Sequence, residues 1–277
     1  MSNSANITIP VDETNPGQFF ACCGLLEVAD RLWPGAEGWF EPGTLRSNFQ
    51  IAASPAANLS DILVTAKRLH FDLGEGERKT DDDGEEEDTK TVKPIIIQSP
   101  VALVLDWWSD KSIKPWAGSM KERLILRAML LAIEPSESDP LNAPKTVFDP
   151  PTASKQGKRN EAPAKREPFY FDCRRGCNAH PLDSGFSPDT QNLKSECFPA
   201  VEAMCFIGLQ RARPAPTDEP NRSRYTVWTK PLPVNAIAPV VCGFTPVHGS
   251  LAFAFHNFFR TDQRKHKCFS RATQRKE

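Results

Sequence analysis

The sequence predicts an α+β protein in which a ferredoxin-like (RNA-recognition-motif-like) unit is followed by a mixed, β-rich C-terminal half. Two observations lead to this fold class. Up to about residue 105 the patterns follow the order strand, helix, strand, strand, helix, strand, which is that of a ferredoxin-like unit. Beyond residue 105 two further helices are expected, and three apolar, strand-like runs close the chain. The expected organisation is a ferredoxin-like region at 1–134 with an acidic loop at 72–90, a basic Pro-rich linker or loop at 135–168, and a basic β-rich region at 169–277.

The first elements have clear sequence signals. Residues 6–11 alternate and are β-branched, which is typical of a strand. A helix follows, because Asn15 can cap it, Pro16 fits its first turn and Pro34-Gly35 ends it. Its apolar residues, among them Cys22, recur at three- and four-residue spacing, so this helix is expected to lie on a core. Further short strands are expected at 38–40, 45–51, 95–97 and 101–105, and helices at 59–69 and, from the Ser119–Glu122 capping box, 119–133.

The remaining segments are assigned from composition and periodicity. Residues 72–90 carry ten acids and form a solvated loop, because such charge density cannot bury itself. Residues 135–168 lack apolar periodicity, which indicates a linker or long loop. The tryptophans Trp107 and Trp108 are exposed candidates that leave room for a partner-dependent fold. Beyond the linker we expect strands at 169–171, 225–229, 237–242 and 251–259 and a helix at 199–210.

Composition and charge exclude several classes of protein. Of 277 residues, 39% are hydrophobic and 25% charged, which is typical of a globular chain. No apolar run approaches the roughly 18 to 20 residues of a membrane span, and no secretory signal is visible, so a cytoplasmic protein with reduced thiols is expected. The net charge of −1 conceals an asymmetry: residues 145–277 hold 21 Lys and Arg against 12 Asp and Glu, and the rest holds 13 against 23. The basic part is the one suited to nucleic acid.

Basic and aromatic residues gather near the C-terminus. Cationic groups neutralise phosphates, and aromatic faces stack on bases. A solvated tail would have the same composition, and the residues alone leave both interpretations open. A second basic element is the Arg174-Arg175 pair. The predicted nucleic-acid-binding residues are Arg174, Arg175, Arg260, Arg264, Lys265, His266, Lys267 and Arg271, with Phe258 or Phe269 stacking.

The sequence also contains residue types that suit two other kinds of site. Cys173, Cys177 and His180 lie within eight residues, but structural zinc usually takes four ligands in two short pairs, and only Cys197 or Cys205 could complete the set by folding back. Ordinary thiols beside a loop histidine are the simpler interpretation, so no metal and no cofactor are expected. A metal-independent ribonuclease would use His180, His248 or His266 as general acid or base, but no catalytic motif is present. No catalytic residue is therefore assigned.

Long segments of the sequence resemble a known family. The opening NPGQFFACCGLLEVADRLWPGAEGWFE is similar to the start of the Csb and Csx effector subunits of type I-U (also called I-G) CRISPR systems. The segments FYFDCRRGCNAHPLDSGFSPD, FPAVEAMCFIGLQRARP, YTVWTKPLP and FRTDQRKHKCFSRA resemble the same family, specifically its third Csb member. The acidic loop and the linker at 135–168 show no such resemblance.

The resemblance implies a non-catalytic subunit of an RNA-guided antiviral surveillance (Cascade-like) complex. In such complexes guide RNA reads the sequence, and protein subunits hold the nucleic-acid backbone. The implied partners are guide RNA or target DNA and other CRISPR effector subunits, with no membrane and no small-molecule substrate. The role within the complex stays open between a subunit that recognises target DNA and a backbone or guide-end subunit. Since the net charge is −1, we expect only the second half to face nucleic acid.

Overall fold

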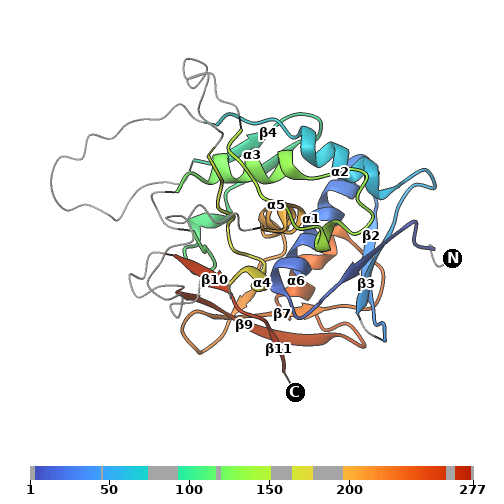
Figure 1. Ribbon diagram of the computed structural model, residues 1–277. Coiled ribbons are helices and arrows are strands. Elements are labelled where there is room, and N and C mark those ends of the chain that lie inside the picture. Colours follow the sequence, from blue (N-terminus) through green and yellow to red (C-terminus); the bar gives the residue numbers. More distant parts are fainter. Residues whose placement is uncertain are drawn as a thin grey trace, which may run out of the picture.

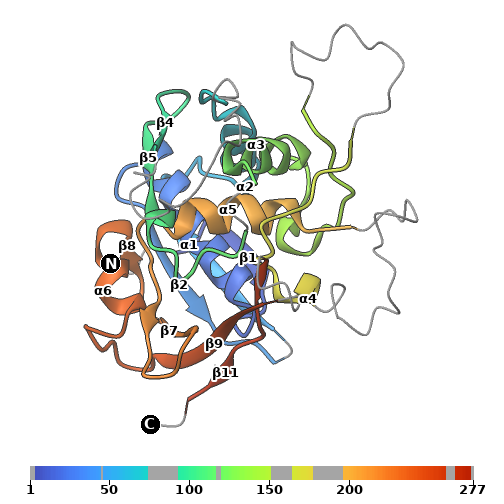
Figure 2. The same cartoon turned by 90° about the vertical axis from the view of Figure 1, so that its left-hand side faces the viewer.

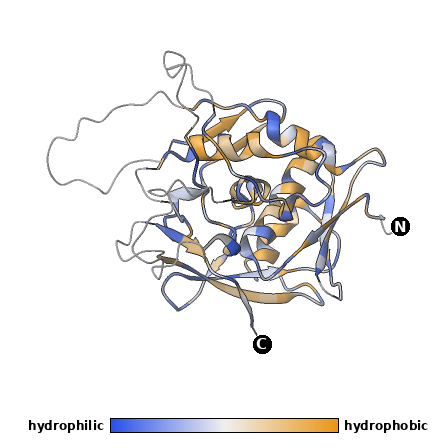
Figure 3. Cartoon of the chain, in the orientation of Figure 1, coloured by the Kyte–Doolittle hydropathy of each residue, from blue (hydrophilic) through white to orange (hydrophobic). Residues whose placement is uncertain are grey.

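Helices α1 (Pro16–Leu32) and α5 (Pro199–Gly208) pack against each other at the centre of the protein (Figure 1). The computed structural model describes residues 4–44, 46–73, 93–116, 120–150, 164–176, 196–259 and 266–275. All of α5 is buried, as is α1 from its first residue to Ala29. A helix that is apolar on nearly every side needs cover on every side, and Figure 3 shows how apolar this central pair is.

Two glycines set the distance between the central helices. A Cβ at Gly24 of α1 would lie 2.0 Å from the carbonyl oxygen of Met204, and a Cβ at Gly208 of α5 would lie 2.0 Å from that of Phe20. No side chain fits such gaps, so the backbones touch directly at this crossing. The crossing joins parts of the chain that lie on either side of residues 135–168, and the buried apolar residues of both parts form one continuous core.

The expected helix at the N-terminus is confirmed, together with its cap. Asn15 Oδ1 accepts a hydrogen bond from the amide of Gly17 over 3.1 Å, and Pro16 occupies the first helical position. Cys22 is fully buried, as its place in the apolar pattern predicted. The first helix and the two strands that follow it are therefore correctly read from local signals.

The first sheet is antiparallel and has the order β1-β3-β2-β8. Strands β1 (Ile7–Val11) and β2 (Glu37–Glu41) border β3 (Ser47–Ala52), and the short β8 (Leu232–Pro233) extends the edge at β2. Gly38 of β2 accepts a hydrogen bond at its carbonyl from Trp228 Nε1 over 2.7 Å. Residues from the second half of the sequence, in β8 and at Trp228, thus bind to a sheet whose other three strands come from the first half.

The α+β class is confirmed, but the fourth strand of a ferredoxin-like unit is placed differently. In that unit the strand after the second helix would join the sheet beside β1. Here β4 (Ile95–Ile97) pairs with β5 (Leu103–Leu105) in a ribbon of its own. Helices α2 (Leu59–Arg68) and α3 (Glu122–Ala132) pack against each other next to it, above α1 and α5 in Figure 1.

The second sheet closes the molecule on the side opposite α2 and α3. Its order is β10-β9-β7-β6, and β11 also pairs with β9 (Figure 2). The inner face carries Tyr225 and Phe253, whose rings are stacked with centroids 5.7 Å apart, and Tyr225 also stacks on Phe19 of α1. The strands are β6 (Ala215–Pro216), β7 (Arg222–Val227), β9 (Leu251–Phe259), β10 (Lys267–Phe269) and β11 (Thr273–Gln274).

Three local expectations were wrong. The run at 237–242 forms a short helix, α6 (Ile237–Val241), instead of a strand. Residues 169–171 are not a strand, and Tyr170 has a φ of 71°. Trp107 and Trp108 are buried because they pack against Phe206 of α5, whose sequence position is about a hundred residues away. The other short helices in the described residues are η1 (Trp107–Ser109), η2 (Pro140–Asn142), α4 (Cys173–Gly176) and η5 (Val234–Ala236).

The described part of 135–168 lies against the core. Leu141 and Val147 are buried, and single β-bridges join Lys145 to Cys197 and Phe148 to Lys165. Most of the acidic loop expected at 72–90 lies outside the described residues. None of the helices described combines the length and apolar character needed to cross a bilayer.

Candidate nucleic-acid interface

The end of β9 presents two aromatic rings to the surroundings. Phe258 is 43% exposed and Phe259 is 38% exposed. Consecutive strand residues point to opposite faces of a sheet, so the two rings lie on opposite faces of the β9–β10 pair. We call this end of the pair, with Phe258, Phe259 and Lys267, the ribbon end. Each face of the ribbon end therefore carries one ring that another molecule can reach.

Lysines accompany these rings. The ammonium group of Lys267 lies 4.9 Å from the centroid of Phe259, and that of Lys114 lies 5.1 Å from the centroid of Trp116. The two segments are joined, because the amide of Lys267 donates to the carbonyl of Pro115 over 2.8 Å. Partial burial lowers the pKa of both ammonium groups. Within the described residues neither lysine forms an ion pair, and Lys267 Nζ donates a hydrogen bond to Asn221 Oδ1 over 3.2 Å.

Phe269 has a different environment from Phe258. Its side chain is fully buried and packs against Phe255, with ring centroids 4.7 Å apart, and against Phe171, at 5.3 Å. Phe269 therefore has no face open to a base, and of the two predicted stacking residues only Phe258 is exposed. Phe259, which we did not assign to the site, shares that exposure.

Several predicted contacts lie outside the described residues or are described only in part. Arg260, Arg264 and Lys265 belong to the segment between β9 and β10, of which the structure describes nothing. His266 is half-buried and directly precedes β10. Arg175 belongs to α4, but its side chain is not described. These assignments remain predictions.

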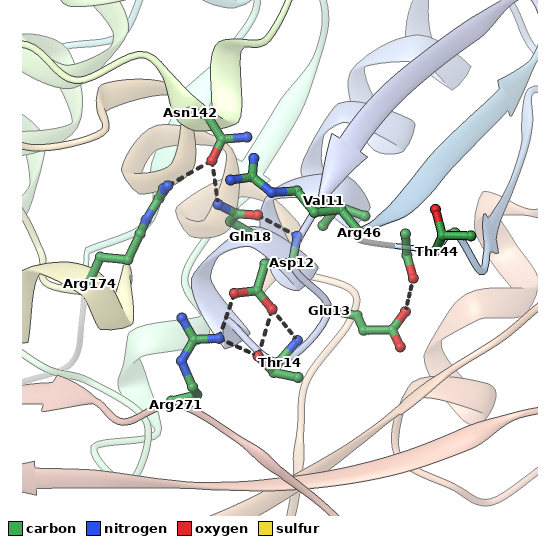
Figure 4. A pocket seen from close by; sticks show the side chains of 12 residues that line it. Val11, Asp12, Glu13, Thr14, Gln18, Thr44, Arg46, Asn142, Arg174 and Arg271 are labelled. Carbon is green, nitrogen blue, oxygen red and sulfur yellow. Dashed lines mark hydrogen bonds and ion pairs between the residues drawn. The ribbon is translucent and has the colours of Figure 1, made fainter.

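The two other predicted arginines meet at a polar cavity of about 480 Å³ (Figure 4). We call it the arginine cavity. Segments far apart in the sequence form its walls: the turn after β1, the start of β3, η2, α4 and the stretch between β10 and β11. Among its lining residues are Asp12, Glu13, Thr14, Arg46, Arg174 and Arg271.

Arg174 is held on every side by other residues of the protein. Its Nε donates to Asp172 Oδ1 over 2.9 Å, Nη1 to Asn142 Oδ1 over 2.7 Å and Nη2 to the carbonyl of Leu141 over 2.8 Å. Its guanidinium also lies 3.4 Å from the ring centroid of Phe198. Asp172 is fully buried, so this ion pair holds α4 in place. As placed, Arg174 is a structural residue with little capacity left for a phosphate.

Arg271 is partly occupied. Its Nη1 donates to Asp12 Oδ2 and to Thr14 Oγ1, each over 2.6 Å, and its side chain is 56% exposed. Burial opposes ionisation of Asp12, but hydrogen bonds from Thr14 and Arg271 outweigh that effect and lower the pKa of this carboxyl. Asp12 is thus an ion at neutral pH, and within the described residues the Nε and Nη2 groups of Arg271 have no partner.

Arg46 is the functional candidate that sequence reasoning missed. It is exposed, it lines the arginine cavity, and among the described residues its guanidinium has no hydrogen-bond or ion-pair partner. Figure 4 shows its side chain on the same side of the cavity as Gln18 and Asn142. Arg46 is a single basic residue in the acidic part of the sequence, and no spacing or motif marks it.

The thiols do not form a metal site in the described part of the chain. Burial raises the pKa of Cys173 to about 12, helped by the charge of Asp172, and burial also raises the pKa of Cys205. Cys177 and His180 lie outside the described residues, and within them no three His, Cys, Asp or Glu side chains are grouped as metal ligands.

The histidines considered for catalysis do not converge. His248 precedes β9, whereas His266 precedes β10, whose Lys267 pairs with Phe259 at the far end of β9. The nine residues of β9 span roughly 25 Å, which separates the two imidazoles too widely to act on one phosphodiester. His180 lies outside the described residues.

Comparison of the chain with protein-family models, with curated proteins and with solved structures returned no match.

Proposed function

We propose that this chain is a non-catalytic subunit of a type I CRISPR RNA-guided surveillance complex and that it binds guide RNA or target DNA through its C-terminal half. The observation that carries the proposal is the ribbon end, where Phe258 and Phe259 are exposed next to Lys267. Aromatic faces beside cationic groups are the means by which proteins hold single strands without reading their sequence. The resemblance of the sequence to the Csb family supplies the biological setting.

Two further features support this assignment. The cations near the ribbon end, Lys114 and Lys267, have no ion-pair partner within the described residues, whereas Arg174 and Arg271 are paired with carboxylates. The order of β1, α1, β2 and β3, with β3 between the other two strands, is that of the first part of a ferredoxin-like unit. We propose that β1–β3 and α1 are related to that fold, which is common among nucleic-acid-binding proteins.

The central experiment removes the two exposed rings. The double variant Phe258→Ala/Phe259→Ala should bind a fluorescent 20-nucleotide single strand at least about fivefold more weakly, since one stacked base is worth about 1–3 kcal/mol. Phe148→Ala is the matched control, because Phe148 is 42% exposed but lies elsewhere. Fluorescence anisotropy measures both. Equal affinity of the double variant and the wild type would refute the ribbon end as the contact.

Membership of the chain in a CRISPR complex needs a separate test. We expect the tagged chain, co-expressed with the neighbouring CRISPR subunits and a repeat array, to elute with a discrete guide-length RNA and with those subunits. A triple variant, Arg264→Ala/Lys265→Ala/Lys267→Ala, should elute with less RNA. Recovery of the wild-type chain alone, without RNA, would separate it from such a complex.

A further inference from the structure

We propose that the arginine cavity is a phosphate-binding site in which Arg46 is the principal ligand and Arg271 the second. The inference rests in part on the proposed function, because nucleic acid is the source of phosphate that we expect. It goes beyond that function by naming a site separate from the ribbon end and the groups that form it.

The first argument is the unequal occupancy of the three arginines. The guanidinium of Arg174 donates hydrogen bonds to Asp172, Asn142 and Leu141 from all three of its nitrogens. Arg271 donates to described residues from Nη1 alone. None of the five N–H donors of the Arg46 side chain forms a hydrogen bond with a described residue. An arginine with every donor open, at a polar cavity built by the protein, is suited to an external anion with several acceptor oxygens.

The second argument is charge. Asp172 neutralises Arg174, and Asp12 neutralises Arg271, through ion pairs of 2.5 and 2.6 Å. Glu13 is the remaining acid of the cavity wall, and its Oε2 accepts a hydrogen bond from Ser47 Oγ over 2.7 Å. Figure 4 shows the Glu13 carboxylate directed away from the part of the cavity that holds Arg46, Arg174 and Arg271. Among the described residues, Arg46 therefore carries the one charge in this part of the cavity that no carboxylate balances.

The third argument is the chemistry of a phosphate. A guanidinium binds two phosphate oxygens at once, and a third oxygen remains for a second donor. The open donors of Arg271 can supply that contact. The carboxylates of Asp12 and Glu13 on the cavity wall would repel a highly charged ligand. A single phosphate group therefore fits the cavity better than a polyphosphate.

The fourth argument is the position of the cavity relative to the ribbon end. Arg271 follows Lys267 by four residues along β10 and the stretch after it. Four residues of extended chain span at most about 13 Å, a distance that a few nucleotides cover. One strand of nucleic acid can thus contact Phe259 and Lys267 with its bases and backbone and place a neighbouring phosphate at the cavity.

The test uses the full-length chain and three probes. These are adenosine 5′-monophosphate and a 12-nucleotide RNA with either a 5′-phosphate or a 5′-hydroxyl. Arg46→Ala should weaken RNA binding at least fivefold and reduce the slope of log K against log salt by about one, as expected for one lost phosphate contact. Arg46→Lys, which keeps the charge but not the bidentate geometry, should lose less. Arg68→Ala, an exposed arginine on α2 outside the cavity, should bind like the wild type.

The two RNAs distinguish the sources of phosphate. An equal loss for both ends would indicate an internal phosphodiester, and a loss confined to the 5′-phosphorylated RNA and the nucleotide would indicate a terminal monoester. Unchanged binding by Arg46→Ala, or an equal loss in Arg68→Ala, would overturn the inference.

The ribbon-end double variant separates this inference from the proposed function. If the wild type bound the nucleotide in an Arg46-dependent manner but neither RNA, the cavity would stand and the proposed function would fail. If RNA binding depended on Phe258 and Phe259 but not on Arg46, the proposed function would stand and the arginine cavity would fail as a phosphate site. If the wild type bound no probe, both would fail.

Discussion

Asn15 Nδ2 donates a hydrogen bond to Asp172 Oδ1 over 2.9 Å, and through it the cap of α1 is joined to the turn that carries α4. The same side chain accepts at Oδ1 from the amides of Gly17 and Cys173. Both residues of the pair are fully buried. One asparagine therefore starts the central helix and fixes the wall of the arginine cavity that holds Arg174.

Replacement of Asn15 should be costly for this reason. Asn15→Ala removes the cap, leaves the buried amides of Gly17 and Cys173 without this acceptor and takes one hydrogen bond from the buried Asp172, so we expect a loss of about 2–4 kcal/mol in the free energy of unfolding. Asn15→Asp should lose at least as much, because it places a second carboxylate against Asp172. Urea unfolding measures both. Asn58→Ala is the control, since Asn58 caps α2 in an exposed position and should lose about 1 kcal/mol. Equal losses at the two caps would contradict the buried role of Asn15.

The glycine contact between α1 and α5 predicts a strong steric effect. Gly24→Ala and Gly208→Ala each force a methyl group against a backbone carbonyl, and we expect a loss of about 3 kcal/mol or more, or no folding. Gly35→Ala serves for comparison, because Gly35 has a φ of +90° but nothing within 4 Å of its Cβ position. Gly35→Ala should lower the free energy of unfolding by only about 1–2 kcal/mol, from backbone strain alone. Thermal unfolding followed by circular dichroism would show the order, and a smaller effect at Gly24 than at Gly35 would refute the contact.

Glu27 should make stability sensitive to acid. Burial opposes its ionisation, but hydrogen bonds from Arg211 and Arg31 outweigh burial and lower its pKa below the ordinary 4.5. A carboxyl with a lowered folded pKa stabilises the protein above about pH 4.5, and that stability is lost as the pH falls through the folded pKa. Glu27→Gln should therefore cost about 1–3 kcal/mol at pH 7 and progressively less below pH 4.5.

Urea unfolding from pH 7 to pH 3 measures this difference. Arg211→Ala should reduce the acid-sensitive part more than Arg31→Ala, because Arg211 makes the larger contribution to the pKa of Glu27. A difference between wild type and Glu27→Gln that stays constant over the whole range would show that Glu27 does not titrate in this way.

The thiols should differ widely in reactivity. Burial raises the pKa of Cys22, Cys23 and Cys205, whereas Cys242 is only half-buried. With Cys177, which lies outside the described residues, changed to Ser, seven of the eight cysteines remain. In that background a thiol reagent should modify Cys242 first and the others only on unfolding. Mass spectrometry of the labelled peptides identifies the site, and early labelling of Cys22 would contradict its burial.

Local sequence signals predicted the ends of α1, whereas α3 begins at Glu122, with Lys121 at its N-cap and no side-chain cap, and not at Ser119 as its expected capping box implied. Asn15, Pro16 and Pro34 gave the limits of α1 without reference to the rest of the fold. The run at 237–242 was ambiguous, since a short apolar segment suits a strand or a buried helix, and tertiary packing decided for α6. Trp107 and Trp108 could not be assigned to the core because their partner, Phe206, is distant in sequence.

The site was predicted in part for the same physical reason. Alternation along 251–259 indicated that some phenylalanines are buried. It did not show that the end of β9, from Phe258 on, extends beyond the residues that cover the rest of the strand. The arginine cavity is assembled from segments that meet only in the folded chain. Arg174 and Arg271 were found because basic residues cluster around them, and Arg46 was missed because it has no such neighbours.

The burial of α1 by α5 has a consequence for synthesis on the ribosome. Pro16 and Gly208 are separated by 192 residues. At a translation rate of about 5–20 residues per second, α1 emerges roughly 10–40 seconds before its partner is complete. During that interval one of the most apolar segments of the protein is without its native cover. Strand β2, which contacts α1 and is synthesised soon after it, is native cover that α1 can gain before α5 arrives.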